Sequence, residues 1–276
     1  MAASLSPTDL EAYLARIGYA GPREATAAVL TAVHAAHART IPFENLDILL
    51  GRTIATGLPA ITRKLVHDRR GGYCFEQNAL LGAALRALGF GVAPLLGRVR
   101  WQVPAEVATP LVHQVLLVTP ADAGPRLADV GFGSMSLTRP LRLVEDEEQF
   151  SGLEPRRLVR RGPLLAHQAR LGETWGDVYT FAPEPVAEVD LELGNWYACA
   201  HPQSAFRHQL RASLTLDDRR HTLLNRDLTV RHADGRVERR VIADADELLA
   251  VLAGYFGLHF PAGTRFALRP DVPWPV

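Results

Sequence analysis

Residues 70–78 read Arg70-Gly71-Gly72-Tyr73-Cys74-Phe75-Glu76-Gln77-Asn78, which places a lone cysteine after a two-glycine bend and at the head of an apolar, helix-like run over 75–88. A thiol there lies near backbone N–H groups without an intrahelical partner and at the positive end of a helix dipole. Both features stabilise a thiolate. Because cysteine is among the most frequently buried residues, a small core side chain is the competing interpretation of Cys74. Catalysis requires a base for this thiol and an acid that orients the base.

The composition limits the classes of function. A chain of 276 residues exceeds one ordinary single-core domain, so two or three modules are expected, and 47% hydrophobic residues can form a sizeable core. Thirty Lys and Arg balance thirty Asp and Glu, and the densest basic cluster, 236–240, is interrupted by an apolar and an acidic residue. Nucleic acid is therefore not expected as a partner. His34 and His37 have helical spacing but no convincing third ligand, so no metal is expected.

The cysteines and the apolar runs indicate the compartment. With two cysteines, Cys74 and Cys199, a disulfide framework is not expected and a reducing compartment is favoured. The first residues lack a basic segment followed by an apolar core, so no secretory signal is expected. The most apolar stretch, 79–96, is broken by Arg86, glycines and Pro94 and is too interrupted to span a membrane. The chain is predicted to be cytoplasmic, without a membrane partner.

Periodicity predicts the order of elements. Apolar residues at helical spacing predict helices from Ser6-Pro7 to Gly18 and over 24–38, 59–66 and 75–88. From Gly91, short Val- and Leu-rich runs separated by Pro, Gly and Asp are typical of an antiparallel sheet. The expected strands are 92–101, 111–118, 126–130, 157–170, 178–181, 228–232 and 236–241, with helices over 189–200 and 244–255.

One predicted hairpin brings a base and an acid together. The segment 119–125 has the composition of a turn, and folding the flanking runs about Ala121 sets His113 opposite Asp129. Cross-strand partners have Cβ atoms roughly 4.5–5.5 Å apart. A core histidine and a turn aspartate before Gly131 are the alternatives. With Cys74 as nucleophile, His113 as base and Asp129 as orienting acid, the set has the arrangement of a papain-like triad.

Three further residues are predicted to support this set. Asn78 lies one helical turn after Cys74 and would hydrogen-bond Asp129. Glu44 belongs to a connector, 41–47, whose simplest interpretation is a packed loop. It would instead pair with Arg70, because a buried arginine requires a carboxylate partner.

The motifs together resemble the arylamine N-acetyltransferases. They are Tyr13-Leu14-Ala15-Arg16-Ile17-Gly18-Tyr19, Ile41-Pro42-Phe43-Glu44-Asn45-Leu46, Arg70-Gly71-Gly72-Tyr73-Cys74-Phe75-Glu76, His113, Asp129-Val130-Gly131-Phe132-Gly133, Asn195-Trp196-Tyr197, His201-Pro202 and Ser204. They occur in order over most of the chain. The resemblance implies an α+β fold with an N-terminal helical bundle (1–89), a central antiparallel β-barrel with an interdomain helix (90–200) and a C-terminal α/β lid (201–276).

The resemblance also implies the chemistry. Acetyl-CoA would be a co-substrate, with no permanently bound cofactor, and the acceptor would be an arylamine, arylhydrazine or arylhydroxylamine, as in xenobiotic metabolism. Cys74 would carry the acetyl group in a ping-pong mechanism while His113 moves protons.

The resemblance also implies two groups of binding residues. Those lining the acceptor pocket would be Phe43, Val99 and Phe132. Those along the CoA pyrophosphate would be Gly131, Gly133, Ser134 and Thr138. Glycine is more common in the family at the position of Ser134, and a side chain there restricts the approach of the backbone to a phosphate.

Two rivals stay open at this stage. A thiol hydrolase or an amide synthase would use the same three residues on another acyl donor, whereas a non-catalytic binding protein would keep the fold and leave Cys74 unacylated. The sequence leaves open the physiological acceptor, the acyl chain length and the oligomeric state, a homo-oligomer included.

Overall fold

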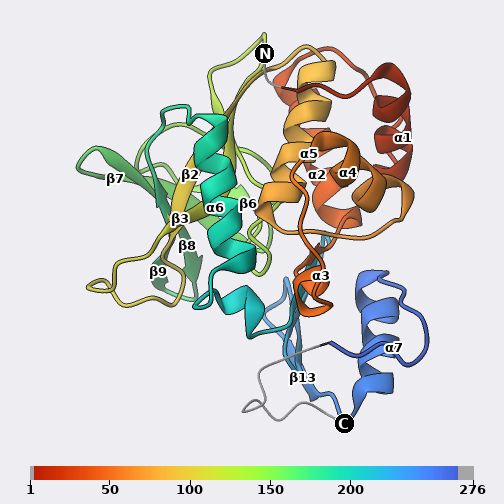
Figure 1. Cartoon of the computed structure of the whole chain (residues 1–276). Coiled ribbons are helices and arrows are strands. Elements are labelled where there is room, and N and C mark those ends of the chain that lie inside the picture. The colour runs from red at the N-terminus through yellow and green to blue at the C-terminus, as the bar shows by residue number, and fades with distance from the viewer. Residues whose placement is uncertain (1–2, 267–276) are drawn as a thin grey trace.

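The computed structural model describes residues 3–266. Figure 1 shows a helical module, a strongly curved sheet crossed by one long helix, and a smaller C-terminal sheet that packs with a helix. Among the described residues no helix is long and apolar enough to cross a membrane.

The N-terminal module is helical, as predicted. Its elements are α1 (Pro7–Ile17), α2 (Ala27–Thr40), β1 (Phe43–Glu44), α3 (Leu46–Leu49), α4 (Leu58–Thr62), a π-helix (Arg63–His67) and α5 (Cys74–Ala87). Ser6 caps α1 through its side chain, and Gly18 ends it in the left-handed region with φ +67°. α2 begins three residues later than predicted because Thr26 accepts the Val29 N–H. The single helix expected over 59–66 is a short α-helix followed by a π-helix.

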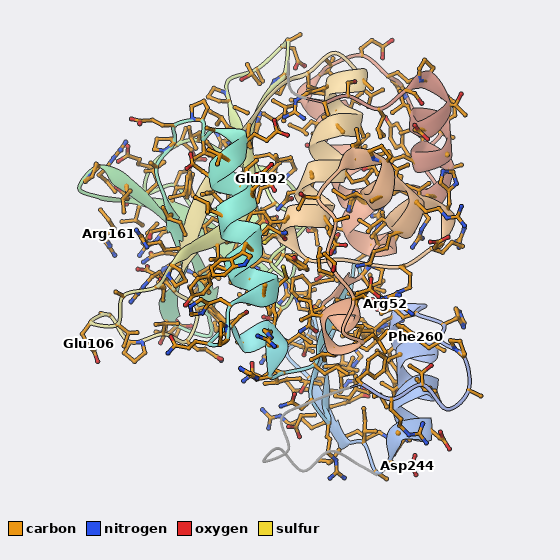
Figure 2. The ribbon with its side chains drawn as sticks, viewed as in Figure 1. Arg52, Glu106, Arg161, Glu192, Asp244 and Phe260 are labelled. Carbon is orange, nitrogen blue, oxygen red and sulfur yellow. The ribbon has the colours of Figure 1, made fainter. Side chains whose placement is uncertain are left out.

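The central module is an eight-stranded antiparallel sheet that curls into a nearly closed barrel (Figure 1). The strand order is β5-β4-β3-β2-β9-β8-β7-β6. Their bounds are β2 (Gly91–Val99), β3 (Leu111–Thr119), β4 (Arg126–Ala128), β5 (Leu141–Arg142), β6 (Gln149–Ser151), β7 (Glu154–Arg161), β8 (Leu164–Leu171) and β9 (Thr174–Phe181). Helix α6 (Glu188–Ala200) follows the barrel strands and carries Glu192, which Figure 2 labels. The barrel core includes Leu95, Val115, Leu127 and Phe181.

The register predicted for the hairpin of β3 and β4 is wrong by one residue at its centre. The observed partners Leu116–Ala128 and Val118–Arg126 centre the turn on Asp122 rather than Ala121, and β4 ends before Asp129. The reason is tertiary, because the Asp122 carboxylate accepts the Ala27 N–H at the start of α2 over 2.7 Å. Local turn composition cannot reveal such a contact.

The C-terminal module consists of a second sheet and a helix. After a 3-10 turn (Ala205–Arg207), its elements are β10 (Arg211–Thr215), β11 (Arg219–Leu224), β12 (Asp227–His232), β13 (Val237–Val241) and α7 (Ala245–Phe256). The sequence predicted the last three and missed β10 and β11. Residues 267–276 of the predicted 201–276 module lie outside the described residues.

The N-terminal and C-terminal modules meet at one strand pair. β1, from the N-terminal module, forms the edge of the C-terminal sheet, with Phe43 opposite Ser213 and Glu44 opposite Ala212. The Glu44 N–H also donates to Gly72 O over 3.1 Å. The C-terminal sheet is therefore hydrogen-bonded, through two residues, to the bend that precedes α5.

Candidate active site

Cys74, His113 and Asp129 lie at the junction of the helical module and the barrel. Cys74 is the first residue of α5, His113 lies on β3 and Asp129 follows β4. His113 Nε2 is 2.8 Å from Asp129 Oδ2, and Cys74 Sγ is 3.6 Å from Val112 O. All three residues are buried. The contact between His113 and Asp129 survives the register difference because Asp129 lies beyond the end of β4 and turns back towards β3.

In the His113–Asp129 pair, each charge stabilises the ionised form of the other group. Burial alone would lower the pKa of His113, but the Asp129 carboxylate and, to a smaller extent, the Cys74 sulfur outweigh it and raise that pKa to about 10. Burial alone would raise the pKa of Asp129, whereas His113 and hydrogen bonds from Asn78 and Gly131 lower it to about 2. The pair is therefore an imidazolium–carboxylate pair at neutral pH. Since Nε2 faces Asp129, Nδ1 is the ring nitrogen left for the thiol.

Asp129 is held by the first turns of α5. Asn78 Nδ2 donates to Asp129 Oδ1 over 2.9 Å, which is the contact predicted from the sequence. The Gly131 N–H donates to the same oxygen over 2.9 Å, and Asn78 Oδ1 accepts the Val130 N–H over 3.0 Å. The helix that carries Cys74 therefore also orients the acid.

His34 is a supporting residue whose role the sequence did not reveal. Its Nε2 accepts the Asp129 backbone N–H over 3.2 Å. Burial lowers the pKa of His34 to about 4, so its ring is neutral and can accept this bond. The available signal was the pair of histidines on one helix, but His37 instead contacts Tyr13 and Gln77. In the described part of the chain no group of three or more His, Cys, Asp or Glu side chains could hold a metal ion.

Aromatic rings surround the imidazole. The ring centroids of Phe132 and Tyr179 lie 5.0 Å and 4.8 Å from that of His113. Burial, with the Asp129 charge, raises the pKa of Tyr179 well above its ordinary value, so Tyr179 stays neutral. These rings exclude water from the imidazole and limit its orientations.

Glycine at position 131 follows from close packing. A Cβ on Gly131 would lie 2.5 Å from Cys74 Cα and 2.9 Å from Asn78 Nδ2, so no larger residue fits without a shift. Gly133 has φ +87°, and a Cβ there would meet the Phe43 ring at 3.1 Å. Both glycines, predicted from the resemblance as CoA contacts, thus have a packing role next to the thiol.

A cavity of about 670 Å³ opens onto Cys74 and His113. Its walls include all three predicted pocket residues, Phe43, Val99 and Phe132, together with Gly131 and Ser134. Thr138 does not line it and lies near Gly152, and Gly133 is not part of its wall.

The far side of this cavity comes from the C-terminal sheet. It contributes four arginines for which no binding role was predicted, namely Arg211, Arg220, Arg231 and Arg239. Arg239 belongs to the basic cluster 236–240. The four arginines reach the site because β1 joins that sheet to the segment before α5.

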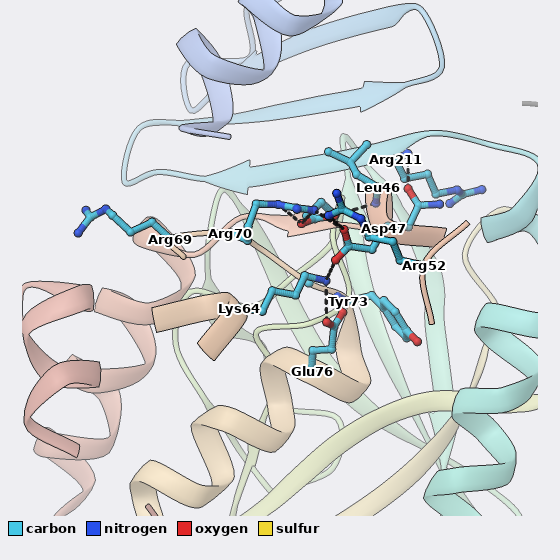
Figure 3. A network of polar contacts seen from close by, with 12 residues as sticks. Leu46, Asp47, Arg52, Lys64, Arg69, Arg70, Tyr73, Glu76 and Arg211 are labelled. Atoms are coloured by element: carbon cyan, nitrogen blue, oxygen red, sulfur yellow. Dashed lines mark hydrogen bonds and ion pairs between the residues drawn. The ribbon is translucent and has the colours of Figure 1, made fainter. Parts of the chain in front are cut away.

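The predicted pair of Arg70 and Glu44 is present in the polar network of Figure 3. Arg70 Nη2 lies 2.7 Å from Glu44 Oε1 and 3.2 Å from Asp47 Oδ1. The Arg70 guanidinium also lies 4.5 Å from the centroid of the Phe260 ring. This pair joins the residue before the bend that precedes Cys74 to β1.

The chain matches known acetyltransferases over nearly its whole length. The sequence model of the N-acetyltransferase family covers residues 26–264, which makes this chain an acetyltransferase by class. The arylamine N-acetyltransferase of Mycolicibacterium smegmatis is 42% identical over 253 residues, 91% of this chain and 92% of the relative. The Salmonella typhimurium arylamine N-acetyltransferase / N-hydroxyarylamine O-acetyltransferase is 40% identical over 250 residues, 90% of this chain and 88% of the relative.

Solved structures agree with these relatives. The Mycobacterium marinum arylamine N-acetyltransferase in complex with CoA superposes with a TM-score of 0.87 at 41% identity, covering 90% of this chain and 92% of that one. The chain belongs to the arylamine N-acetyltransferase family. The family expected from the sequence motifs is confirmed.

Proposed function

We propose that this enzyme transfers an acetyl group from acetyl-CoA to the nitrogen of an arylamine or arylhydrazine, or to the oxygen of an arylhydroxylamine, through acetyl-Cys74. The observation that carries the proposal is the buried His113–Asp129 pair beside Cys74 at one end of the cavity. The names of the relatives support the acceptor class, and the CoA complex of the M. marinum protein supports the donor.

The first half-reaction acetylates the enzyme. A protonated His113 beside the sulfur stabilises the Cys74 thiolate, which attacks the thioester carbonyl carbon of acetyl-CoA. The new bond joins Cys74 Sγ to the acetyl carbon, and the bond from that carbon to the CoA sulfur breaks. His113 gives its proton to the departing CoA thiolate. The N–H groups of Cys74 and Phe75, at the start of α5, suit the negative charge on the carbonyl oxygen, whereas that of Glu76 already donates to Tyr73 O.

The second half-reaction returns the enzyme to its starting state. The acceptor nitrogen attacks the acetyl carbon of acetyl-Cys74 and loses a proton to the now neutral His113. The Cys74 sulfur leaves as a thiolate, and the imidazolium forms again. Asp129 stabilises that imidazolium and holds its Nε2 while Nδ1 exchanges the proton.

The cavity suits a large anionic donor and a flat acceptor. Near Cys74 its walls are aromatic and apolar through Phe43, Val99 and Phe132, which fits an aryl ring. Farther away, Arg211, Arg231 and Arg239 of the C-terminal sheet provide charge for phosphate groups, whereas Arg220 is already paired with Glu154. Gly131 and Ser134 line the part near the thiol, and we assign the donor's path past them. Ser134 would keep the phosphate farther from the backbone than glycine would.

The compartment and assembly are part of the same proposal. The two cysteines of the chain, Cys74 and Cys199, are free thiols, which fits a reducing cytoplasm. The proposal needs only acetyl-CoA and a small-molecule acceptor, because all three reacting side chains come from one chain.

The decisive test is acetylation of the wild-type enzyme without an acceptor. Intact mass after incubation with acetyl-CoA should rise by one acetyl group, and peptide mapping should place it on Cys74. Cys74→Ser is the matched control for the adduct site, and Cys199→Ser, which should retain the adduct, is the control for the other thiol. A wild-type enzyme that stays unmodified sinks the transferase proposal and favours a non-catalytic binding protein.

The hydrolase and amide synthase alternatives need a second measurement. Acetyl-Cys74 should persist in buffer and disappear within the mixing time when an arylamine is added, with N-acetylarylamine as product. Rapid loss in buffer alone would favour the hydrolase. Acylation only by other acyl donors, followed by intramolecular amide formation, would favour the amide synthase.

A further inference from the structure

An ion pair between Lys64 and Glu76 lies at the first turn of α5, the helix that begins with Cys74. Lys64 Nζ, from the π-helix, is 2.7 Å from Glu76 Oε1 on the first turn of α5 and 2.9 Å from Asp47 Oδ2. The side chain of Glu76 is 2% exposed and that of Lys64 16%. Figure 3 shows Lys64 reaching between Asp47 and Glu76, while Arg69 points away from the network.

The second oxygen of Glu76 fixes the start of the helix. The Tyr73 N–H donates to Glu76 Oε2 over 3.1 Å, so the carboxylate caps α5 at the residue before Cys74. Gly72 allows this approach, because a Cβ there would lie 2.6 Å from the same oxygen. Both Glu76 oxygens are therefore acceptors, one for the Lys64 ammonium and one for the backbone.

Cys74 is separated by one bond from the capped residue. The amide of Tyr73 and the carboxylate of Glu76 close a ring around the backbone of Cys74, which sets the direction of its side chain towards β3. Gln77 adds a second restraint, since its Nε2 donates to Gly72 O over 2.8 Å. Two side chains of the same helix thus hold the backbone immediately before the nucleophile.

The surroundings of Glu76 act on its pKa in opposite directions. Burial raises the pKa of Glu76 to about 7 against the opposing effect of Lys64, and Glu44 on β1 raises it further. Glu76 in turn contributes to the raised pKa values of the Tyr73 hydroxyl and of the Cys199 thiol on α6.

The other charges lie one step farther away. Asp47 on α3 shares Lys64 with Glu76, and Arg70 pairs with Asp47 and Glu44. Lys64 is the only cation within ion-pair distance of Glu76 among residues 3–266.

We propose that the Lys64–Glu76 pair positions Cys74 for attack by locking the carboxylate that caps α5. Lys64 and Glu76 are positioning residues that contact neither the donor nor the acceptor. The inference rests on the proposed role of Cys74 as nucleophile. It predicts that the pair acts as one unit, since the ammonium matters only through the orientation it gives to the capping carboxylate.

Two substitutions, Glu76→Gln and Lys64→Met, test whether Lys64 and Glu76 act together, because each changes the hydrogen bonds of the pair in a different way. Glu76→Gln keeps the shape but offers one acceptor where two are needed, so its NH₂ must face either the Lys64 ammonium or the Tyr73 N–H. Lys64→Met removes the ammonium with a similar chain length and leaves Glu76 free to change rotamer. In the double variant Gln can accept the Tyr73 N–H without facing a cation.

The experiment is a double-mutant cycle on single-turnover acetylation of Cys74 by acetyl-CoA. Each single variant should lose about tenfold in rate, because a misplacement of about 1 Å can cost about 10²-fold and the shift expected here is smaller. The double variant should be no slower than either single one. Arg52→Ala is the matched control: Arg52 pairs with Asp47 in the same network, its side chain is 60% exposed, and it does not contact Glu76. Its rate should equal that of the wild type.

The outcomes separate this inference from the proposed function. Wild-type protein that takes up no acetyl group overturns the function itself. If wild-type Cys74 is acetylated, then additive losses in the double variant, or variants that unfold more easily yet acetylate at the wild-type rate, overturn the positioning role.

The pH profile provides an independent measurement. Alkylation of Cys74 by iodoacetamide, which needs no CoA site, should fall more steeply from about pH 8 to about pH 6 in the wild type than in the double variant. The reason is that Glu76 takes up a proton in this range and loses its attraction to Lys64. Identical profiles would contradict the proposal.

Discussion

Two of the buried carboxylates in this protein, Asp129 and Glu154, pair with cations that differ in what they can do. Asp129 pairs with one imidazole, that of His113, whereas Glu154 at the start of β7 pairs with two guanidiniums. Arg220, from β11, makes two contacts with Glu154, of 2.6 Å and 3.0 Å, and Arg156 makes one of 2.9 Å. Both carboxylates join separate modules of the fold.

The two clusters differ in whether the cation can exchange a proton and in whether every polar atom has a hydrogen-bond partner. An imidazole can give and take a proton at a ring nitrogen during a reaction, whereas a guanidinium is a poor proton donor, so only the Asp129 pair suits acid–base chemistry. Asp129 receives bonds from Asn78 and the backbone as well as from His113. In contrast, no group in residues 3–266 accepts from Nε or Nη1 of fully buried Arg156. The Glu154 cluster is therefore structural and carries an excess positive charge, which the active-site pair does not.

The largest effect is expected for Asp129→Asn. The amide would keep the shape, but it would remove the charge that maintains His113 as an imidazolium in a fixed orientation. We expect acetylation of Cys74 to slow by about 10³-fold to 10⁴-fold, the effect known for such triads. Quenched-flow mass spectrometry on the acetyl-enzyme measures it.

The matched control is Asp146→Asn, which makes the same chemical change at an exposed position in the barrel module. Its rate should equal that of the wild type, and circular dichroism should show all three proteins folded. An Asp129→Asn enzyme that acetylates within threefold of the wild type would remove the distinction between the two carboxylates.

Substitutions in the Glu154 cluster should change the free energy of unfolding. Glu154→Gln leaves Arg156 and Arg220 buried without a counter-charge, and we expect the free energy of unfolding to fall by about 3–5 kcal/mol. Arg156→Met should cost much less, within about 1 kcal/mol, because it removes an excess charge along with two nitrogens that lack protein partners and leaves the Glu154–Arg220 pair neutral. Burial lowers the pKa of Arg156 to about 10, which shows that the site disfavours its charge.

Urea denaturation of the two variants and the wild type measures this difference. The comparison is internal, since both substitutions neutralise one member of the same cluster. Equal losses of unfolding free energy for Glu154→Gln and Arg156→Met would contradict this prediction. They would show that the Arg156 guanidinium stabilises the fold as much as the Glu154 carboxylate does.

The sequence reveals what is encoded locally and misses what other modules supply. The N-cap and terminal glycine of α1 and the apolar run of α5 are local signals, so these helices could be predicted closely. β10 and β11 were missed because β11 carries a buried arginine, Arg220, whose partner Glu154 lies in the barrel and hides the apolar alternation.

The same distinction applies to the candidate site. Cys74, His113 and Asp129 could be selected from residue type and order, and Asn78 from helical spacing. His34 could not, because its bond to the Asp129 amide depends on how α2 packs against the barrel. The arginines around the cavity were missed for a related reason, since the pairing of β1 with β10 brings their sheet to the site.

The smallest expected effect is a pH dependence of stability that belongs to the active-site pair alone. The folded pKa of His113 is about 10 and the ordinary value about 6.5, so protonated His113 stabilises the fold fully below pH 6.5, and this contribution is lost as pH rises towards 10. Between about pH 7 and pH 9 the unfolding free energy of the wild type, measured relative to His113→Gln, should therefore fall by about 2–3 kcal/mol. Urea denaturation of both proteins at each pH gives this difference, and groups common to both cancel. The Glu154 cluster is present in both proteins, so its contribution cancels in this difference. A constant difference would mean that His113 is neutral in the folded enzyme, and the resting state would then be a thiol beside a neutral base.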